Sequence, residues 1–186
     1  VMEGAMEAAR RVVEERGAFM PEQFTNPANP GIHERTTARE LMRAFVGQSI
    51  DAFDAADGTG GTVSGVGEAL KARNASTRVV AVEPAASPVL NGGPPGPTKI
   101  QGLTAGFVPD NDHPDVVDEV IGVSDRDAWD TKLALATQEG LLLGISAGAN
   151  VWAARQVARA LGPGKSVVTI LCDTGERYFS LGAYFQ

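Results

Sequence analysis

The residue types with the clearest chemical use in this sequence form the loop Gly58-Thr59-Gly60-Gly61-Thr62. The loop follows an apolar segment that ends near Ala56, and it opens a helical pattern that carries Val66 and Leu70. Glycines let a backbone approach a phosphate closely, the N–H groups of a first helical turn donate to its oxygens, and threonine hydroxyls add donors. The spacing therefore predicts a cradle for a terminal phosphate. A turn that only connects a strand to a helix is the alternative.

The loop matches neither of two familiar nucleotide-binding motifs. No Lys-Ser or Lys-Thr pair follows it, as a P-loop requires, and its glycine spacing departs from G-x-G-x-x-G. A nucleoside triphosphate is therefore disfavoured as the ligand.

Two other glycine-rich turns occur in the sequence. One runs from Gly144 to Asn150, and its Ser146 stands where a helix N-cap belongs, so this serine either caps the helix or contacts a ligand. The other spans residues 99–107 and contains Gly102. Three such turns in one parallel sheet predict a shared crevice, because ligands bind beyond the carboxyl ends of parallel strands.

Short apolar segments alternate with amphipathic ones along most of the chain. Strands separated by crossover helices predict an α/β fold with a largely parallel sheet that is covered on both faces. The predicted strands cover residues 49–56, 78–84, 119–123, 141–145 and 166–172. The predicted helices cover residues 2–16, 36–45, 62–73, 125–138 and 147–161.

Two proline-containing stretches are predicted to be irregular. Residues 23–33, QFTNPANPGIH, favour a loop over a helix or a central strand because of their prolines and asparagines. Residues 85–99 combine prolines and glycines over a length too great for a simple turn. We expect an ordered excursion there, over the surface or near the site.

The composition limits the possible partners. The 186 residues suffice for one sizeable α/β domain, or for one domain and part of a second. A formal charge of −7 and the lack of any lysine or arginine run argue against nucleic acid and anionic membranes. Without a spanning apolar run or a secretory signal, the chain is expected to be cytoplasmic. Its single cysteine, Cys172, and the separated His33 and His113 form no metal-ligand pattern, and both histidines are expected to be structural or solvated.

Six segments together resemble a known family. QFTNPANPGIHERTT, GTGGTVSG, VEP, KIQGLTAGF, GISAGA and CDTGERYFS occur in the order and at the intervals of the cysteine synthase family. These fold-type II (tryptophan synthase β-like) enzymes depend on pyridoxal 5′-phosphate (PLP) and include O-acetylserine sulfhydrylase and, more distantly, cystathionine β-synthase. The resemblance implies β-replacement on an activated serine, in which O-acetylserine and sulfide give cysteine and acetate. It also implies a homodimer and serine acetyltransferase as a partner.

The resemblance implies roles for individual residues. The loop 58–62 matches the family's loop around the cofactor phosphate. Ser146 matches the serine whose hydroxyl meets the pyridine nitrogen, and a neutral hydroxyl leaves the ring a milder electron sink, which suits β-elimination and β-replacement. Gln23 matches a glutamine in the pocket for the substrate carboxylate, and Gly102 matches a glycine whose backbone faces that pocket. Glu176-Arg177-Tyr178 is expected to fix the exit of the last strand rather than touch substrate.

The family's Schiff-base lysine has no counterpart here. Neither its asparagine- and serine-containing motif nor the following S/T-G-N-x-G loop occurs. Residues 1–24 resemble the tail of a smaller N-terminal subdomain and residues 25–186 the large PLP-binding domain, so about the first two fifths of a family chain are expected to be absent. The valine at position 1 fits that expectation, and apolar surface is expected to be exposed. The lysines, none of which matches the family position, are Lys71, Lys99, Lys132 and Lys165.

Two aspartates depart from the family pattern beside the loop. Valine-like and glycine residues usually occupy positions 54–57, where this chain has Asp54 and Asp57. Their opposite parity directs them to opposite faces of a sheet covered on both sides, so at least one is expected to be buried. A carboxylate about 4 Å from a phosphate charge would cost roughly 4 kcal/mol at an effective dielectric constant near 20. A weakened or degenerate phosphate site is therefore predicted.

Three functions fit these residues. The first is the larger part of a PLP-dependent cysteine synthase, active only when an N-terminal portion completes it. The second is a non-catalytic fragment or decoy subunit that keeps the fold. The third is a different phosphate binder on the same sheet, which the KIQG and GISAG motifs disfavour. Cystathionine β-synthase chemistry is not separated from sulfhydrylase chemistry by these residues, although the compact length favours the sulfhydrylase.

Overall fold

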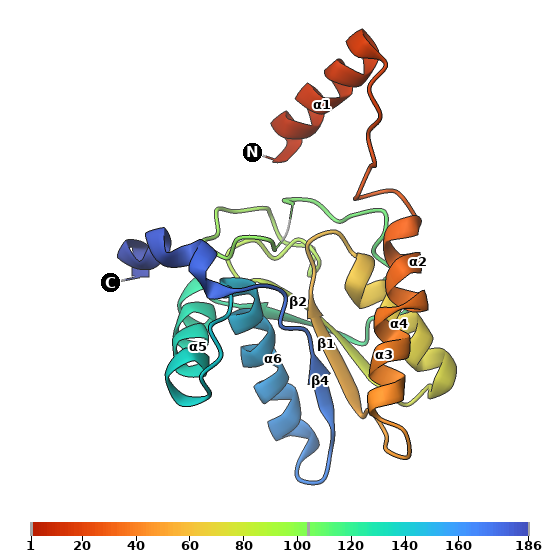
Figure 1. Cartoon of the computed structure of the whole chain (residues 1–186), viewed down its shortest axis with the longest axis vertical. Coiled ribbons are helices and arrows are strands. Elements are labelled where there is room, and N and C mark those ends of the chain that lie inside the picture. The colour runs from red at the N-terminus through yellow and green to blue at the C-terminus, as the bar shows by residue number, and fades with distance from the viewer. Residues whose placement is uncertain (1, 104, 186) are drawn as a thin grey trace.

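Four parallel strands form the centre of the structure, a computed structural model that describes residues 2–103 and 105–185 (Figure 1). The spatial order is β3-β2-β1-β4, and every neighbouring pair is parallel. The predicted α/β fold with a largely parallel sheet is therefore confirmed. The strands are β1 (Ala52–Ala56), β2 (Arg78–Pro84), β3 (Glu119–Val123) and β4 (Val167–Thr169).

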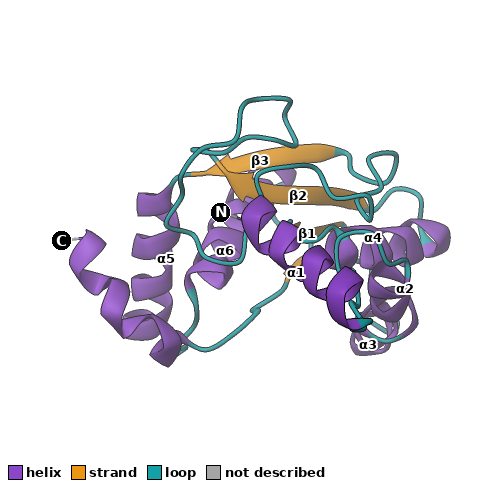
Figure 2. Ribbon diagram, turned by 90° about the horizontal axis from the view of Figure 1, so that it is seen from above, coloured by secondary structure: helices purple, strands orange, loops and turns teal. Residues whose placement is uncertain are grey.

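Helices occupy both sides of this sheet. They are α1 (Met2–Arg16), α2 (Ala28–Arg35), α3 (Thr37–Ala44), α4 (Gly61–Arg73), α5 (Asp125–Gln138) and α6 (Ile145–Leu161), followed by the 3-10 helix η1 (Gly175–Phe185). α2, α3 and α4 lie on one side, and α5 and α6 lie on the other (Figure 2). All five predicted helices are confirmed, with ends that differ by two residues at most.

Alternating strand residues explain the two layers. In β1, Phe53 and Ala55 pack with the apolar side chains of α3 and α4, whereas Ala52 packs with Val157 of α6. Val80 of β2 joins Ala52 in that second group. These side chains are at most 2% exposed. Because successive side chains of a strand point to opposite faces, both faces of the sheet are buried, as a parallel sheet requires.

α1 projects beyond the loops at the carboxyl ends of the strands, and an extended segment joins it to α2 (Figure 1). None of its described residues is buried. Met2 and Met6 on its inner side line a shallow hollow together with Met20 and Phe24. Phe19, in the extended segment, is 88% exposed. The expected exposure of apolar surface is thus observed, while the proposed division into residues 1–24 and 25–186 stays a prediction.

The loop predicted over residues 23–33 was wrong in its second half, which forms α2. Pro27 is the N-cap residue, and Pro30 falls in the first helical turn. N–H groups of a first turn have no partner within the helix, so a proline there removes no hydrogen bond. The side chain of Asn26 adds a helix-starting contact by accepting from Ala28 N at 3.0 Å.

Two strand predictions near the C-terminal half also need correction. Residues 141–145 form no strand, and only an isolated antiparallel bridge joins Leu143 to Thr174. Leu141 and Leu142 are exposed because the chain passes directly from α5 to α6 over the surface. The strand predicted over 166–172 is shorter, since β4 pairs with β1 only as far as Asp54 and then leaves the sheet.

The proline-rich excursion over residues 85–99 is ordered around a buried carboxylate. Glu83, at the end of β2, is fully buried and accepts from Leu90 N at 2.8 Å and from Asn91 Nδ2 at 2.6 Å. Gly96 N donates to Ser87 Oγ at 3.1 Å. The prediction of an ordered excursion is confirmed, and its anchor is a glutamate that the sequence pattern had placed simply within a strand.

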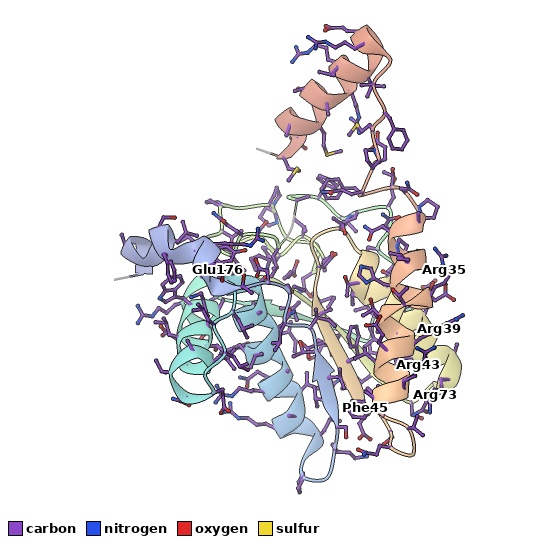
Figure 3. All side chains as sticks on the ribbon, in the orientation of Figure 1. Arg35, Arg39, Arg43, Phe45, Arg73 and Glu176 are labelled. Carbon is purple, nitrogen blue, oxygen red and sulfur yellow. The ribbon has the colours of Figure 1, made fainter. Side chains whose placement is uncertain are left out.

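The outer side of α2 and α3 is strongly basic. Arg35, Arg39 and Arg43 extend from it away from the sheet (Figure 3), whereas Ala38 on the inner side is fully buried. This amphipathic pattern fixes which side of the two helices faces α4, and it leaves the inner side of α2 to meet the loop 58–62.

Candidate cofactor site

One apolar cluster brings the three predicted glycine-rich turns together at the carboxyl ends of the strands. The cluster contains Ile100, Leu103 and Ile145, with Ala56 of β1 packed against it. These residues flank the turn around Gly102, the start of α6 and the loop 58–62, respectively. Gly58 lies so close to Gly102 that a Cβ at position 58 would clash with the Gly102 carbonyl oxygen. The predicted shared crevice is therefore supported by packing.

Two glycines of the loop are required by close backbone approach. Gly60 adopts φ 78°, in the left-handed region that favours glycine, and it is the N-cap of α4. A Cβ there would meet the backbone of Asn111 and Asp112, and a Cβ at Gly61 would overlap the side chain of Asn29. The loop is thus pressed between α2 and the segment around residue 111, and it leads into the N-terminus of α4, a helix end of the kind that binds anions.

Side chains from α2 hold both threonine hydroxyls of the loop. Asn29 Nδ2 donates to Thr59 Oγ1 at 2.9 Å. His33 Nε2 lies 3.2 Å from Thr62 Oγ1, and its Nδ1 lies 3.0 Å from Thr37 Oγ1. Burial lowers the pKa of His33, which keeps its ring neutral at pH 7. His33 is therefore a structural residue, as expected, but one that positions the loop.

Gln23 reaches this assembly through its backbone. Its carbonyl oxygen accepts from Asn29 Nδ2 at 2.8 Å and from Asn111 Nδ2 at 2.9 Å. The side chain of Gln23 is exposed, so its contact with a substrate carboxylate stays a prediction. Asn29 and Asn111 are the supporting residues that sequence reasoning missed. Asn29 lies in the quoted QFTNPANPGIHERTT segment, which could have indicated it, whereas nothing in the sequence singled out Asn111.

Ser146 lies in the first turn of α6 and is 7% exposed. The N-cap of α6 is Gly144, not Ser146, and no side chain caps this helix, so the capping interpretation of Ser146 was wrong. The Ser146 side chain faces the Cys172 thiol, whose pKa is raised by burial and lowered to a smaller extent by Ser146. One turn further along, Asn150 Nδ2 donates to Ile170 O at 2.7 Å. The hydroxyl is therefore left to a neighbour or ligand rather than to the helix backbone.

Both aspartates beside the loop are buried, which confirms the expectation that at least one would be. Asp54 is fully buried, its Oδ2 accepts from Thr169 Oγ1 at 2.9 Å, and burial raises its pKa to about 7. Asp57 is 4% exposed, and its Oδ1 accepts from Gly60 N at 2.6 Å. Burial raises the pKa of Asp57 to about 6, with the charges of Asp112 and Glu83 adding to the rise.

The segment after β4 closes the region from the side. Tyr178 Oη donates to Asp173 Oδ2 at 2.5 Å, and a Cβ at Gly144 would clash with both residues. Glu176 lies at the start of η1 (Figure 3) and accepts from Thr174 Oγ1 at 2.7 Å. These contacts support the expectation that residues 176–178 fix the exit of the last strand.

Three of the four lysines are engaged away from the loop. Lys71 Nζ pairs with Asp118 at 2.7 Å, and Lys165 Nζ pairs with Asp51 at 2.9 Å. Lys132 Nζ lies over the ring of Trp129, 4.9 Å from its centroid. The side chain of the fourth, Lys99, is exposed.

Comparison with known proteins identifies the family. The sequence profile described as "Pyridoxal-phosphate dependent enzyme" matches residues 1–173. This chain belongs to that family of PLP-dependent enzymes. It is 51% identical over 183 residues to the cysteine synthase of Staphylococcus aureus (strain Mu50), covering 98% of this chain and 59% of the relative. The resemblance inferred from six motifs is therefore confirmed.

Solved structures agree with the family assignment. The crystal structure of O-ureido-L-serine synthase matches with a TM-score of 0.92 and 41% identity, over 95% of this chain and 56% of that one. O-acetyl serine sulfhydrylase isoform 3 from Entamoeba histolytica matches with a TM-score of 0.91 and 39% identity, over 99% and 55%. The chain thus spans 55% to 59% of the length of these three relatives.

The donor set of the site fits the phosphate of the family's cofactor. Gly58 permits close backbone approach, α4 begins at the loop, and the hydroxyls of Thr59 and Thr62 are oriented by α2. Ser146 offers a neutral hydroxyl for a ring nitrogen. Asp57 opposes the fit, because its carboxylate occupies the N–H of Gly60.

The described residues give no indication of a metal centre or a membrane span. No group of three or more potential ligands among histidine, cysteine, aspartate and glutamate is placed to hold a metal ion in residues 2–103 and 105–185. Within the same residues, no helix has the length and apolar character needed to cross a bilayer.

Proposed function

We propose that this chain provides the phosphate loop and the ring-nitrogen contact of a PLP-dependent cysteine synthase, which replaces the leaving group of O-acetylserine with sulfide. The observation that carries the proposal is the paired positioning of the Thr59 and Thr62 hydroxyls by Asn29 and His33 at the start of α4. A connecting turn needs no such positioning of two hydroxyls. The 51% identity to a cysteine synthase supports the choice of reaction.

The hydroxyls are arranged to donate outward. Thr59 Oγ1 already accepts from Asn29, so its proton is free for an incoming phosphate oxygen. Neutral His33 can accept from Thr37 at Nδ1 and donate from Nε2 to Thr62, which leaves the Thr62 proton for the same phosphate. Bound PLP supplies the electron sink that stabilises negative charge at the substrate α-carbon. Ser146, with its neutral hydroxyl, keeps that sink mild.

We further propose that catalysis needs a lysine that lies outside residues 1–186. Lys71, Lys132 and Lys165 are engaged elsewhere, and the exposed Lys99 does not match the family's lysine position. The relatives are longer than this chain, which covers 59% of the Staphylococcus aureus enzyme. A segment of such a relative that this chain does not match is therefore the expected source of the lysine.

Complementation tests this function. This chain is co-purified with the unmatched segment of the Staphylococcus aureus enzyme, and cysteine formation from O-acetylserine and sulfide is followed. We expect activity only in the mixture, and none when the lysines of the added segment are replaced by alanine. Activity of this chain alone would contradict the proposal, as would a mixture that binds PLP but makes no cysteine.

A non-catalytic subunit is the second candidate, favoured by the contact of Asp57 with the loop. PLP binding separates the two candidates, since a decoy has no need to retain it. Cystathionine β-synthase-like use of another thiol stays open and is tested by offering homocysteine in place of sulfide.

Three further properties are proposed from the sequence and from the family resemblance. They are a homodimer, a cytoplasmic location and serine acetyltransferase as a partner. Size-exclusion chromatography with light scattering tests the first. Co-purification with the acetyltransferase tests the third, and localisation of the tagged protein in its native cell tests the second.

A further inference from the structure

The phosphate loop contains its own anion. Gly60 N donates to Asp57 Oδ1 at 2.6 Å, and Gly60 is the N-cap of α4. A carboxylate at a helix N-terminus uses the same N–H groups and the same helix dipole that would hold a phosphate. Asp57 therefore competes with a phosphate oxygen for the same donor.

The fold keeps Asp57 in this place. Its backbone N–H donates to Val82 O at 2.9 Å, which fixes the residue at the end of β1 beside β2. Its side chain is 4% exposed. On the far side of the loop, the backbone of Asn111 and Asp112 packs directly on Gly60. Neutralising the carboxylate therefore disturbs fewer contacts than moving it.

Two acidic neighbours of Asp57 make its negative charge more unfavourable. β2 contributes buried Glu83, and the segment after Asn111 contributes Asp112, whose Oδ1 is buried and has no hydrogen-bond partner among the described residues. His113 lies beside Asp112 and pairs with Glu68, with Nδ1 2.7 Å from Oε1. α2 contributes neutral His33 at Thr62, and the turn around Gly102 contributes exposed Lys99. None of the ion pairs within the described chain involves Asp57.

We propose that Asp57 gates the loop: its carboxylate holds the Gly60 N–H in the place of a cofactor phosphate, and phosphate enters together with a proton that neutralises Asp57. The inference rests on the proposed function, because it concerns the same loop, and it adds a proton as an obligatory companion of the phosphate. The rise in the pKa of Asp57 to about 6 supports it, since the proton is then taken up close to neutral pH. Above that pH, affinity should fall by up to about tenfold per pH unit.

Sulfate is the probe of choice, because unlike phosphate it does not titrate near neutral pH. The amide signals of Gly60, Gly61 and Thr62 are followed by NMR while sodium sulfate is added at constant ionic strength, at about pH 5.5 and about pH 8. We expect wild-type affinity to be at least about tenfold weaker at the higher pH. Asp57→Asn, which keeps the shape but not the charge, should bind at both pH values with the acidic affinity of the wild type.

Two further variants separate the role of Asp57 from that of its neighbours. Asp112→Asn should retain most of the pH dependence, because Asp112 does not contact Gly60 N. Asp57→Val should bind sulfate at least as tightly as Asp57→Asn, because valine removes the hydrogen-bond acceptor as well as the charge. The Gly60 N–H is then left for the sulfate. The same pH dependence in wild type and Asp57→Asn would overturn the gate while leaving the phosphate loop intact. Lack of sulfate binding by all folded forms at both pH values would overturn the loop itself, and with it the proposed function.

Discussion

The side chain of Asn29 ties α2 to the phosphate loop by donating to Thr59 Oγ1 at 2.9 Å. The same nitrogen donates to the carbonyl of Gln23 at 2.8 Å, and the amide occupies the space where a side chain at Gly61 would lie. One residue thus orients a hydroxyl, anchors the segment before α2 and demands a glycine in the loop. Asn29 is a positioning residue for whatever anion the loop holds.

Asn29→Ala should weaken PLP binding by about fivefold, since a misaligned hydroxyl loses roughly one hydrogen bond, about 1 kcal/mol. Equilibrium dialysis measures the change. Asn26→Ala is the matched control, because among the described residues the Asn26 side chain hydrogen-bonds to Pro21 O and Ala28 N at the start of α2 and not to Thr59. It should lower the free energy of unfolding by about 1 kcal/mol and leave affinity unchanged. Equal losses of affinity in both variants would remove the special role of Asn29.

Gly58→Ala should abolish measurable PLP binding. The new Cβ would clash with the Gly102 carbonyl oxygen, a backbone atom that cannot swing aside, so the loop and the turn around Gly102 must separate. Gly4→Ala in α1 is the control, because nothing lies within 4 Å of its new Cβ. It should raise helix stability locally by up to about 1 kcal/mol without affecting binding. Wild-type affinity in Gly58→Ala would show that the two turns do not share a ligand.

Ser146→Ala should reduce PLP affinity several-fold and lower the free energy of unfolding by less than the loss of a helix cap does, because Ser146 is not the cap of α6. Ser124→Ala is the control variant, for which the opposite result is expected. Ser124 caps α5 by accepting from Asp127 N at 3.0 Å. Its loss should cost about 1 kcal/mol of stability and no affinity. Urea unfolding and dialysis on both variants check the crossed pattern, and a destabilised Ser146→Ala with unchanged affinity would restore the capping role.

Asp54→Val should stabilise the protein in alkaline solution. The folded-state pKa of Asp54 is about 7 against an ordinary 3.8, so the folded chain holds a proton that the unfolded chain has lost. Wild-type stability therefore rises as pH falls from about 8 to about 4 on account of this group. At about pH 8, Asp54→Val should raise the free energy of unfolding by roughly 2 to 4 kcal/mol. The loss of the hydrogen bond from Thr169 offsets part of this gain.

Urea unfolding of Asp54→Val across this pH range measures the effect, and the advantage of the variant should shrink in acid. Asp51→Asn should show the opposite pH dependence of stability. The Ser166 backbone N–H and Lys165 lower the pKa of Asp51, so its charge stabilises the fold above its ordinary pKa and that stability is lost in acid. An advantage of Asp54→Val that does not vary with pH would show that the gain comes from packing alone.

The sheet, the helix α1 and the helices α3 to α6 could be predicted because each depends on a local period of apolar residues. The prediction failed where a local sequence signal was followed without regard to where the segment lies relative to the neighbouring helices. Pro30 breaks a helix interior but fits a first turn, and Leu141 to Leu143 look like a strand but lie on the surface between two helices. Neither outcome is encoded in the residues themselves, since each depends on where the neighbouring helix starts.

The candidate site could likewise be predicted only in part from the sequence. The loop 58–62 is contiguous, so its glycines and threonines predict an anion cradle without tertiary information. The residues that orient it, Asn29, His33 and Asn111, reach it across 30 to 50 positions of sequence, about which a single sequence says nothing. Burial of at least one of Asp54 and Asp57 followed from strand parity, whereas the contact of Asp57 with Gly60 N depends on the conformation of the folded loop.

The most direct test of the central claim is PLP binding to the purified chain, followed by borohydride reduction and mass spectrometry of the intact protein. We expect saturable PLP binding that pyridoxal, which lacks the phosphate, does not compete away, and an unchanged protein mass after reduction. A stoichiometric reduced adduct on Lys71, Lys99, Lys132 or Lys165 would contradict it. So would a chain that binds pyridoxal and PLP equally well.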